Sequence, residues 1–416
     1  MSPMTLTEKV IARAAGAESV RAGDEVWVTA DRMIMNDSSG PRRLAPLVEE
    51  LGGLWDPSRV VVASDHFVPA ANVRHAEILK TTRDWATAGT VGGFYEYEGI
   101  LHSLVLQEKL VHPGMLLVGA DSHTGTAGAM GAVAVAVGST ELATVLATGQ
   151  IWLRVPQTIG ISLSGTLPHL VSMRDVTMRI IGDLGTTVAS YKAVEYSGDF
   201  VEGLSLEQRM VLTNQGVALG AKNTVVIPTV ALENAMGEMS REVPSARPDA
   251  GAQYVQLHEY DVSTMEPLVA LPPSPDNVAA PSELPPTPVD MAWLGSCVGG
   301  RLADLHSAAA LLCDQRVRVP LLVTPATRAI YQRCVEDGTL ATLVSAGATI
   351  MPPGCGACAG VHAGVQGPGD RVIATATRNF PGRMGSRDSE TILGSAFTVA
   401  ASALAGRVAD PREVLA

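Results

Sequence analysis

The stretch Pro352-Pro-Gly-Cys-Gly-Ala-Cys-Ala-Gly360 decides how this chain is interpreted, because it joins Cys355 and Cys358 in a C-x-x-C pair. A third cysteine, Cys297, stands earlier in Gly295-Ser-Cys-Val-Gly-Gly-Arg301. Structural zinc sites and electron-transfer clusters usually take four protein ligands. Three thiolates therefore indicate an iron-sulfur cube that leaves its fourth iron free for a substrate.

Spacing alone leaves other interpretations of the cysteine pair open. A lone C-x-x-C is also typical of a thioredoxin-type redox pair or of half a zinc ribbon. The flanking Gly354, Gly356 and Gly360 favour a cluster, because they let backbone amides approach bridging sulfides. The remaining Cys313 and Cys334 are expected to be ordinary, partly buried thiols.

Composition predicts a globular protein of two or three domains, with 46% hydrophobic residues among 416. Five cysteines, an odd number, argue against a disulfide framework and favour a reducing compartment. The chain has neither an apolar run long enough for a membrane span nor a signal sequence at its start. We therefore expect a cytoplasmic protein that does not enter a membrane.

The charge balance bears on the partners of this protein. Thirty basic and 42 acidic side chains give a net charge of −12, which disfavours nonspecific binding to nucleic acid or to membranes. Aromatic residues make up only 4%, so there is little material for stacking bases. An anionic substrate would need a locally positive pocket.

Short β-branched runs alternate with Ala/Leu-rich stretches of helical length, which predicts α/β layers. Four such runs are residues 25–29, 59–63, 115–119 and 223–227. The proline-rich residues 271–288 are expected to form an interdomain linker, because so many prolines fit neither a helix nor a central strand. Residues 289–294 after it read as a strand that ends just before Cys297. Ligands bind at the carboxyl ends of strands in open α/β sheets.

Two further polar clusters follow predicted strands. Asp65-His66 comes directly after an apolar run, and a carboxylate beside an imidazole orients it for proton transfer. Asp121-Ser122-His123 follows another run and leads into a Gly/Ala-rich predicted helix. Taken alone, a pair such as Asp65-His66 is more often structural or incidental than catalytic.

His102 and two arginines complete the set of candidates. His102 lies at the head of a predicted helix among apolar residues, where a satisfied core histidine is the usual outcome. Arg378 and Arg383 flank the turn in Arg-Asn-Phe-Pro-Gly-Arg, and such guanidinium forks suit carboxylates. Alone, they would read as solvated loop arginines.

In combination, these motifs resemble the aconitase superfamily and, within it, the family of large subunits of 3-isopropylmalate dehydratase and homoaconitase. The resemblance covers nearly the whole chain and keeps the order of the motifs. It rests on Asp65-His66, Gly99-Ile-Leu-His102, Pro113 to Thr124, Trp152 to Pro156, Gly295-Ser-Cys297 with Arg301, Cys355-Gly-Ala-Cys358 and Arg378 to Arg383.

The resemblance implies a 4Fe-4S cluster held by Cys297, Cys355 and Cys358. It implies an α/β fold of three α/β/α domains packed around the cluster, over residues 1–160, 161–270 and 289–416, without the mobile swivelling domain of single-chain aconitases. Catalytic roles fall to Asp65, His66, His102, Asp121 and His123. Substrate-binding roles fall to Ser122, Asn214, Arg301, Arg378 and Arg383.

The activity that the resemblance implies is dehydration and rehydration of a 2-substituted malate such as isopropylmalate, through an alkene. A separate small subunit would carry the swivelling domain, and a small di- or tricarboxylate would be the substrate. Two alternatives stay open. One is a homoaconitate or methylmalate-type dehydratase of a specialised pathway, and the other is a non-catalytic cluster-binding sensor.

The chain departs from the family pattern at several positions near the expected site. Val298-Gly299 replaces a usual Thr-Asn, and Ala218 stands where a glutamate is common. Thr377 takes the place of an asparagine, and Asn36-Asp37 that of His-Asp. Because changes of this kind around metal ligands alter activity by about 10- to 100-fold, we expect a divergent paralogue that still binds a cluster.

Overall fold

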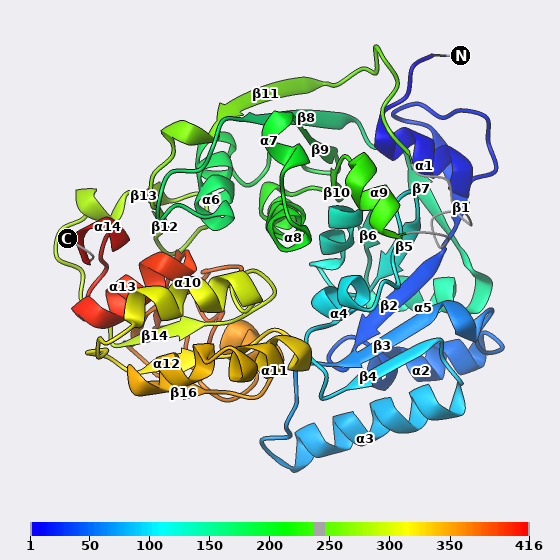
Figure 1. Cartoon of the computed structure of the whole chain (residues 1–416). Coiled ribbons are helices and arrows are strands. Elements are labelled where there is room, and N and C mark those ends of the chain that lie inside the picture. Colours follow the sequence, from blue (N-terminus) through cyan, green and yellow to red (C-terminus); the bar gives the residue numbers. More distant parts are fainter. Residues whose placement is uncertain (1, 237–245, 415–416) are drawn as a thin grey trace.

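The computed structural model of the protein describes residues 2–236 and 246–414 and confirms the α/β fold class. Three sheets dominate it, and the segments that build them follow one another along the chain. Figure 1 shows the first sheet and its helices in blue and cyan, the second in green and the third in yellow to red. None of the helices in the described part of the chain has the length and hydropathy needed to span a bilayer.

The first sheet has five parallel strands in the order β4-β3-β2-β5-β6. Its strand β3 (Val60–Ser64) is buried at every position, as is typical of a central parallel strand covered on both faces. The other strands are β2 (Arg32–Asn36), β4 (Gly93–Glu96), β5 (Leu116–Gly119) and β6 (Val133–Ala136). Helices α1 (Leu6–Ala14), α2 (Pro41–Glu50), α3 (Val73–Ala88), α4 (Leu101–Gln107) and α5 (Ser139–Thr148) accompany it, with an antiparallel ribbon of β1 (Glu25–Thr29) and β7 (Gln150–Arg154).

The order of these strands creates a switch point. The chain steps from β2 outward through β3 to β4, then returns to the other side of β2 for β5 and β6. The loops after β3 and after β5 therefore leave the sheet on the two sides of β2, and a crevice forms between them at the carboxyl ends. Both polar clusters predicted from the sequence follow these two strands.

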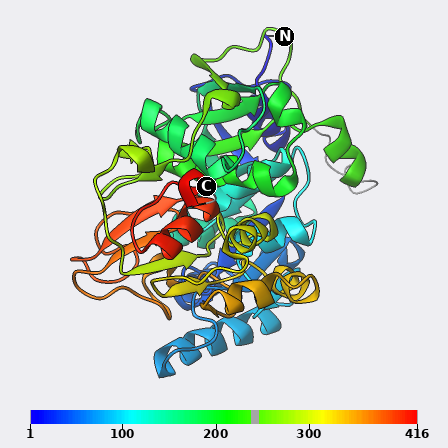
Figure 2. The same cartoon turned by 60° about the vertical axis from the view of Figure 1, so that its left-hand side comes forward.

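The second sheet is parallel, with the order β10-β9-β8-β11. Its strands are β8 (Thr158–Ser164), β9 (Ala193–Ser197), β10 (Asn223–Val226) and β11 (Gln256–Asp261), and its helices α6 (Met173–Leu184), α7 (Asp199–Glu202), α8 (Leu206–Gln215) and α9 (Val230–Met236). Helix α8 packs against the 3-10 turn at Thr124–Met130 of the first part. In the rotated view the green second sheet lies above the orange and red third part (Figure 2).

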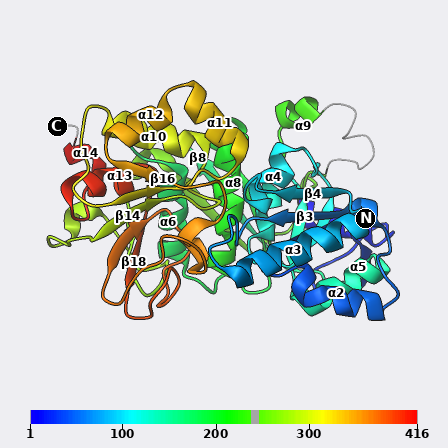
Figure 3. The same cartoon turned by 90° about the horizontal axis from the view of Figure 1, so that it is seen from below.

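The third sheet also has a switch point, because β15 and β16 lie on one side of β14 and β17 and β18 on the other. Its order is β13-β12-β18-β17-β14-β15-β16, and the strands from β18 to β16 are parallel. They are β12 (Val269–Ala270), β13 (Val278–Ala279), β14 (Met291–Leu294), β15 (Leu321–Val323), β16 (Ala348–Ile350), β17 (Arg371–Ala374) and β18 (Glu390–Gly394). The helices are α10 (Leu302–Leu312), α11 (Arg328–Glu336), α12 (Thr339–Ser345), α13 (Ala396–Ala405) and α14 (Pro411–Val414). Viewed from below, they lie opposite α2, α3 and α5 of the first part (Figure 3).

The proline-rich stretch expected as a linker is more ordered than a bare connection. Strand β13 lies within it and forms the edge of the third sheet, followed by a short 3-10 turn at Pro281–Glu283. An edge strand tolerates neighbouring prolines because one side of it needs no ladder hydrogen bonds. The domain boundaries at residues 160, 270 and 288 stay predictions.

Candidate active site

Asp65 and His66 leave the carboxyl end of β3 as a tight pair. His66 Nδ1 lies 2.6 Å from Asp65 Oδ1, and Asp65 Oδ2 accepts the Leu101 N–H at 2.9 Å. The Asp65 carbonyl accepts the Cys355 N–H at 2.8 Å, which ties this loop to the cysteine loop of the third sheet. Ligand atoms of Asp65, His66 and Cys355 all lie within 4.8 Å of one another.

The charge on this pair follows from its neighbours. Burial lowers the pKa of the His66 imidazole, but interactions with Cys355 and Asp65 outweigh burial and raise that pKa well above its ordinary value. Asp37, at the end of β2, accepts the backbone N–H groups of His66 and Phe67 at 3.1 and 3.0 Å. Burial and the Asp65 carboxylate raise the pKa of Asp37 to about 6.

The second cluster is centred on Asp121, after β5. Its Oδ1 lies 2.9 Å from His102 Nε2 and accepts the His123 N–H at 2.8 Å. Its Oδ2 accepts Asn36 Nδ2 at 3.0 Å. Burial raises the pKa of Asp121, but the His102 and His123 contacts outweigh it and hold that pKa well below its usual range. This partly buried carboxylate is thus kept ionised by donors from strand β2, from helix α4 and from its own loop.

His123 has the opposite environment to His66. Burial lowers the pKa of His123 to about 4, although Asp121 acts against it, and the nearby Arg378 and His102 add to the lowering. Its Nε2 is buried and has no hydrogen-bond partner among the described residues. The neutral imidazole therefore has a ring nitrogen available for a bound ligand. Ser122, the exposed residue beside it, lies with Oγ 3.4 Å from His123 Nδ1.

The three predicted cysteines come together from two loops of the third sheet. Cys297 follows β14, whereas Cys355 and Cys358 lie in the loop after β16. All three are free thiols, with Cys297 and Cys358 buried. Asn214 Nδ2 donates to Cys297 Sγ at 3.0 Å, and Arg383 Nη2 donates to Cys358 Sγ at 3.6 Å.

The pKa values of the three thiols shift in different directions. Burial and the nearby Cys358 raise the pKa of Cys297 to about 12, and burial with Asp65 raises that of Cys355 well above its usual value. For Cys358, burial is outweighed by Arg383 and the pKa is lowered. Three neighbouring thiolates, two of them buried, repel one another unless a metal centre replaces their protons, so this donor set fits a metal cluster.

The local backbone also fits a bound group. Ser296, before the first cysteine, has φ +72°, and its Oγ donates to the Thr375 carbonyl at 2.8 Å. Gly356 and Gly360 have φ +54° and +65° around Cys358. Left-handed conformations of this kind concentrate at functional sites, where surrounding contacts hold them in place.

The other two cysteines lie outside the site. Cys334 is fully buried in the core of the third part, on α11. Cys313, at the end of α10, is exposed rather than partly buried as expected, because the helix ends there. Neither supplies a fourth ligand near Cys297, Cys355 and Cys358.

The predicted arginines differ in what their guanidinium groups contact. Arg378 makes no hydrogen bond to the described residues, and it lies close enough to Asp121 and His123 to influence both pKa values. Arg383 has a buried Nε without a partner. Arg301, by contrast, is bonded to the Asp304 carboxylate at 2.9 Å, to the Val298 carbonyl at 2.7 Å and to the Glu207 carbonyl. Its N–H groups are largely used by the protein itself.

Some residues of this site escaped sequence reasoning. Thr126 Oγ1 accepts the Asn214 amide at 2.9 Å and so orients it toward Cys297. Thr375 Oγ1 donates to the Gly295 carbonyl at 2.9 Å and accepts the Gly295 N–H at 2.8 Å. A Cβ on Gly299 would collide with the Thr375 side chain. In this backbone, position 299 is thus restricted to glycine by a threonine far along the chain, which no local pattern signals.

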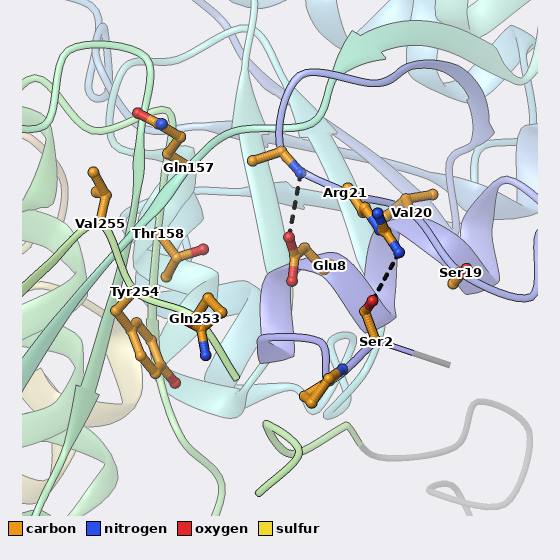
Figure 4. A pocket seen from close by; sticks show the side chains of 12 residues that line it. Ser2, Glu8, Ser19, Val20, Arg21, Gln157, Thr158, Gln253, Tyr254 and Val255 are labelled. Carbon is orange, nitrogen blue, oxygen red and sulfur yellow. Dashed lines mark hydrogen bonds between the residues drawn. The ribbon is translucent and has the colours of Figure 1, made fainter. Parts of the chain in front are cut away.

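A large cavity elsewhere holds none of the predicted residues. It measures about 430 Å³ and lies between the N-terminal turn, the loop around Arg21 and residues 253–255 (Figure 4). A second cavity of about 580 Å³ reaches His66 and is lined by Arg42, Arg43 and Arg74 with no acidic side chain. It supplies the local positive charge that an anionic substrate requires in an acidic protein.

Comparison with known proteins identifies the family of this chain. The aconitase family (aconitate hydratase) matches residues 8–288 and 279–406. The chain is similar to the 3-isopropylmalate dehydratase large subunit 1 of Methanopyrus kandleri, with 43% identity over 99% of both chains. It is 40% identical to the protein of that name from Pyrococcus furiosus over 100% of both chains. It is 39% identical to the probable methanogen homoaconitase large subunit of Methanothermobacter thermautotrophicus over 99% of both.

A solved structure shares the fold. The holo-form of aconitase X from Thermococcus kodakaraensis matches with a TM-score of 0.51 and 12% sequence identity, over 85% of this chain and 84% of that chain. At this identity the likeness concerns the arrangement of helices and sheets alone.

Proposed function

The chain belongs to the aconitase family, and on that premise we propose that it is the large subunit of an iron-sulfur hydro-lyase. The enzyme dehydrates a 2-substituted malate such as isopropylmalate and adds water back at the neighbouring carbon. One observation carries the proposal: the free Cys355 lies beside the Asp65-His66 pair, Cys297 and Cys358 are free and buried, and Arg383 donates to Cys358 while its buried Nε has no partner among the described residues.

Cys297, Cys355 and Cys358 would hold a 4Fe-4S cluster, which supplies Lewis-acid chemistry that makes a hydroxyl group a better leaving group. Asn214 orients and partly neutralises Cys297 by its 3.0 Å hydrogen bond. Arg383 does the same for Cys358. The free thiols also support the cytoplasm as the compartment, since reducing conditions preserve them.

The protein's own acid and base groups divide the proton chemistry. His66, protonated and oriented by Asp65, would donate its proton to the departing hydroxyl oxygen. Asp121 holds His102 through a 2.9 Å contact and keeps it beside the neutral His123. Arg378 and Arg383 would bind the substrate carboxylates, each as a bidentate fork.

The relatives are named large subunits, and we infer a small subunit as the partner of this chain. That partner would close the site over the crevice and supply the base that removes the carbon-bound proton. The isolated large subunit with its cluster is then expected to be inactive.

A second candidate is a tricarboxylate substrate, as in the homoaconitase named among the relatives. The cavity beside His66 favours it, because Arg42, Arg43 and Arg74 line that cavity without an acidic residue to pair with them. A third carboxylate would fit this surface, whereas an isopropyl group gains nothing from it.

The test is anaerobic purification of this chain with a candidate small subunit, followed by a screen of 2-isopropylmalate, 2-methylmalate and homocitrate for alkene formation. We expect turnover of at least one, lost in Cys355→Ser and kept in the matched control Cys313→Ser, whose thiol is exposed and distant. Higher kcat/KM for homocitrate, reduced by Arg74→Ala, would select the second candidate. An intact cluster without turnover of any substrate would instead support a sensor.

A further inference from the structure

Arg174 is a buried cation that the mechanism above does not use. It lies in the first turn of α6, which begins with Ser172 as N-cap and Asp175 closing a capping box. Only 4% of its surface is exposed. In the sequence it stands inside an ordinary helix-start pattern, so nothing there marks it as functional.

The hydrogen bonds of Arg174 are incomplete. Its Nη2 donates to the Ala376 carbonyl at 2.9 Å, while Nε and Nη1 are buried and have no partner among the described residues. The equally buried Arg209 donates to the carbonyls of Ala129, Val226 and Ile227. Arg301 is paired with Asp304. Compared with these two, Arg174 leaves more of its buried N–H donors unpaired.

The adjacent carboxylate does not pair with it either. Asp175 accepts the Leu268 N–H at 3.0 Å and both the N–H and hydroxyl of Ser172 at 2.8 Å. Burial raises the pKa of Asp175 to about 6, so its negative charge is itself poorly stabilised. A buried charge is costly unless an opposite charge balances it.

The negative groups near Arg174 are Asp175 and, when ionised, two of the cysteines. Burial lowers the pKa of Arg174 to about 10, and Arg301 adds to this, whereas Asp175 and the thiolates of Cys297 and Cys358 act to raise it. The Ala376 carbonyl that anchors Arg174 precedes Thr377, whose Oγ1 lies 3.7 Å from Cys358 Sγ. The guanidinium therefore lies near two of the three thiols, brought there by helix α6.

We propose that Arg174 is a positioning residue that places a permanent positive charge behind Cys297 and Cys358, balancing the anionic thiolate-bound cluster. The inference rests on the proposed function. A fixed cation favours the more negative, reduced form of such a centre and holds the thiolates against reprotonation. Without this charge, the reduction potential of the cluster would fall and the cluster would be released faster.

The test measures the cluster rather than turnover. The anaerobically reconstituted complex is compared with Arg174→Gln, Arg174→Met and Arg174→Lys by a reductive titration followed by electron paramagnetic resonance. The neutral variants are expected to lower the ratio of reduced to oxidised cluster at a given potential by about tenfold, or about 59 mV for one electron. Arg174→Lys should restore the wild-type value because it keeps the charge.

Cluster release to a chelator gives a second readout, followed by visible absorbance. We expect at least fivefold faster loss in the two neutral variants, and no change in Arg179→Met, an exposed arginine of the same helix. Arg174→Gln keeps a donor for the Ala376 carbonyl, so it still decides the outcome if Arg174→Met does not fold. A cluster-loaded Arg174→Gln with wild-type potential and release rate would overturn this inference alone. A wild-type chain that binds no cluster would overturn the proposed function and this inference together.

Discussion

The two Asp-His clusters of the first sheet use the same residue types at equivalent strand ends, yet their imidazoles differ in charge. His66, after β3, is surrounded by Asp65 and Cys355, which overcome the effect of burial and raise its pKa. In His123, after β5, burial prevails, and Arg378 adds to the lowering of its pKa to about 4. One imidazole is thus protonated and the other neutral at the same pH, which is how a site separates a proton donor from a neutral ligand.

The difference lies in segments brought from the third sheet. Cys355 reaches His66 from the loop after β16, and Arg378 reaches His123 from the loop after β17. A thiol that is negative only when ionised approaches one histidine, and a permanent cation approaches the other. The first sheet supplies two similar clusters, and the third sheet makes them unequal.

The largest effect is expected from removing the charge that keeps His66 protonated. Asp65→Asn should lower kcat by about 100- to 10,000-fold, the range for loss of a positioned acid. The measurement is the initial rate of hydration by the complex, with cluster content checked by absorbance. Asp84→Asn, on the exposed face of α3, is the control. A fall of less than threefold would contradict a role for the Asp65-His66 pair.

Arg378→Met should have the second-largest effect, because it removes the cation beside His123. Without this cation the pKa of His123 rises, and a substrate carboxylate loses its partner. We expect KM to rise about 10- to 100-fold, since a hydrogen bond to a charged group contributes about 1.5–3 kcal/mol. Steady-state kinetics separates KM from kcat, and Arg387→Met, exposed in the same loop, is the control. An unchanged KM would remove Arg378 from substrate binding.

The lowered pKa of His123 predicts a pH dependence of stability. Between about pH 6.5 and 4 the unfolded chain binds a proton that the folded chain excludes, so the free energy of unfolding falls as the pH is lowered through this window. The contribution between pH 7 and 4.5 is about 2 kcal/mol. Urea unfolding of the apo chain at both pH values measures it. His123→Gln should lose this part of the pH dependence, and equal slopes in both proteins would refute the assignment.

The smallest effect concerns Asn36, which donates to Asp121 at 3.0 Å. Asn36→Ala should reduce kcat/KM by about fivefold, because a single hydrogen bond contributes about 1 kcal/mol. Asn36→His, which introduces the residue more usual in the family, should keep most of the activity. The reverse order of the two variants would show that the amide is specifically required.

The sequence was enough to name the cysteines and Asp65-His66 as candidates and to predict the α/β class. Each of these depends on local patterns or on spacing within one loop. The sequence did not reveal what Arg301 contacts, since the use of a buried guanidinium depends on carbonyls and carboxylates from other segments. Nor did it signal Arg174, whose surroundings come from the third sheet. The Gly/Ala-rich stretch after Asp121 was expected as a helix and is a 3-10 turn leading into β6, because its glycines allow close approach of the second sheet.

The contact between Gly299 and Thr375 has a consequence for engineering this loop. A larger residue at position 299 collides with Thr375, and a smaller residue at 375 would abandon the hydrogen bonds that hold Gly295 in front of Cys297. Substitutions at the two positions are therefore expected to be non-additive in stability, because residues in contact share their interactions. A redesign of the loop around Cys297 must treat Gly299 and Thr375 as one unit.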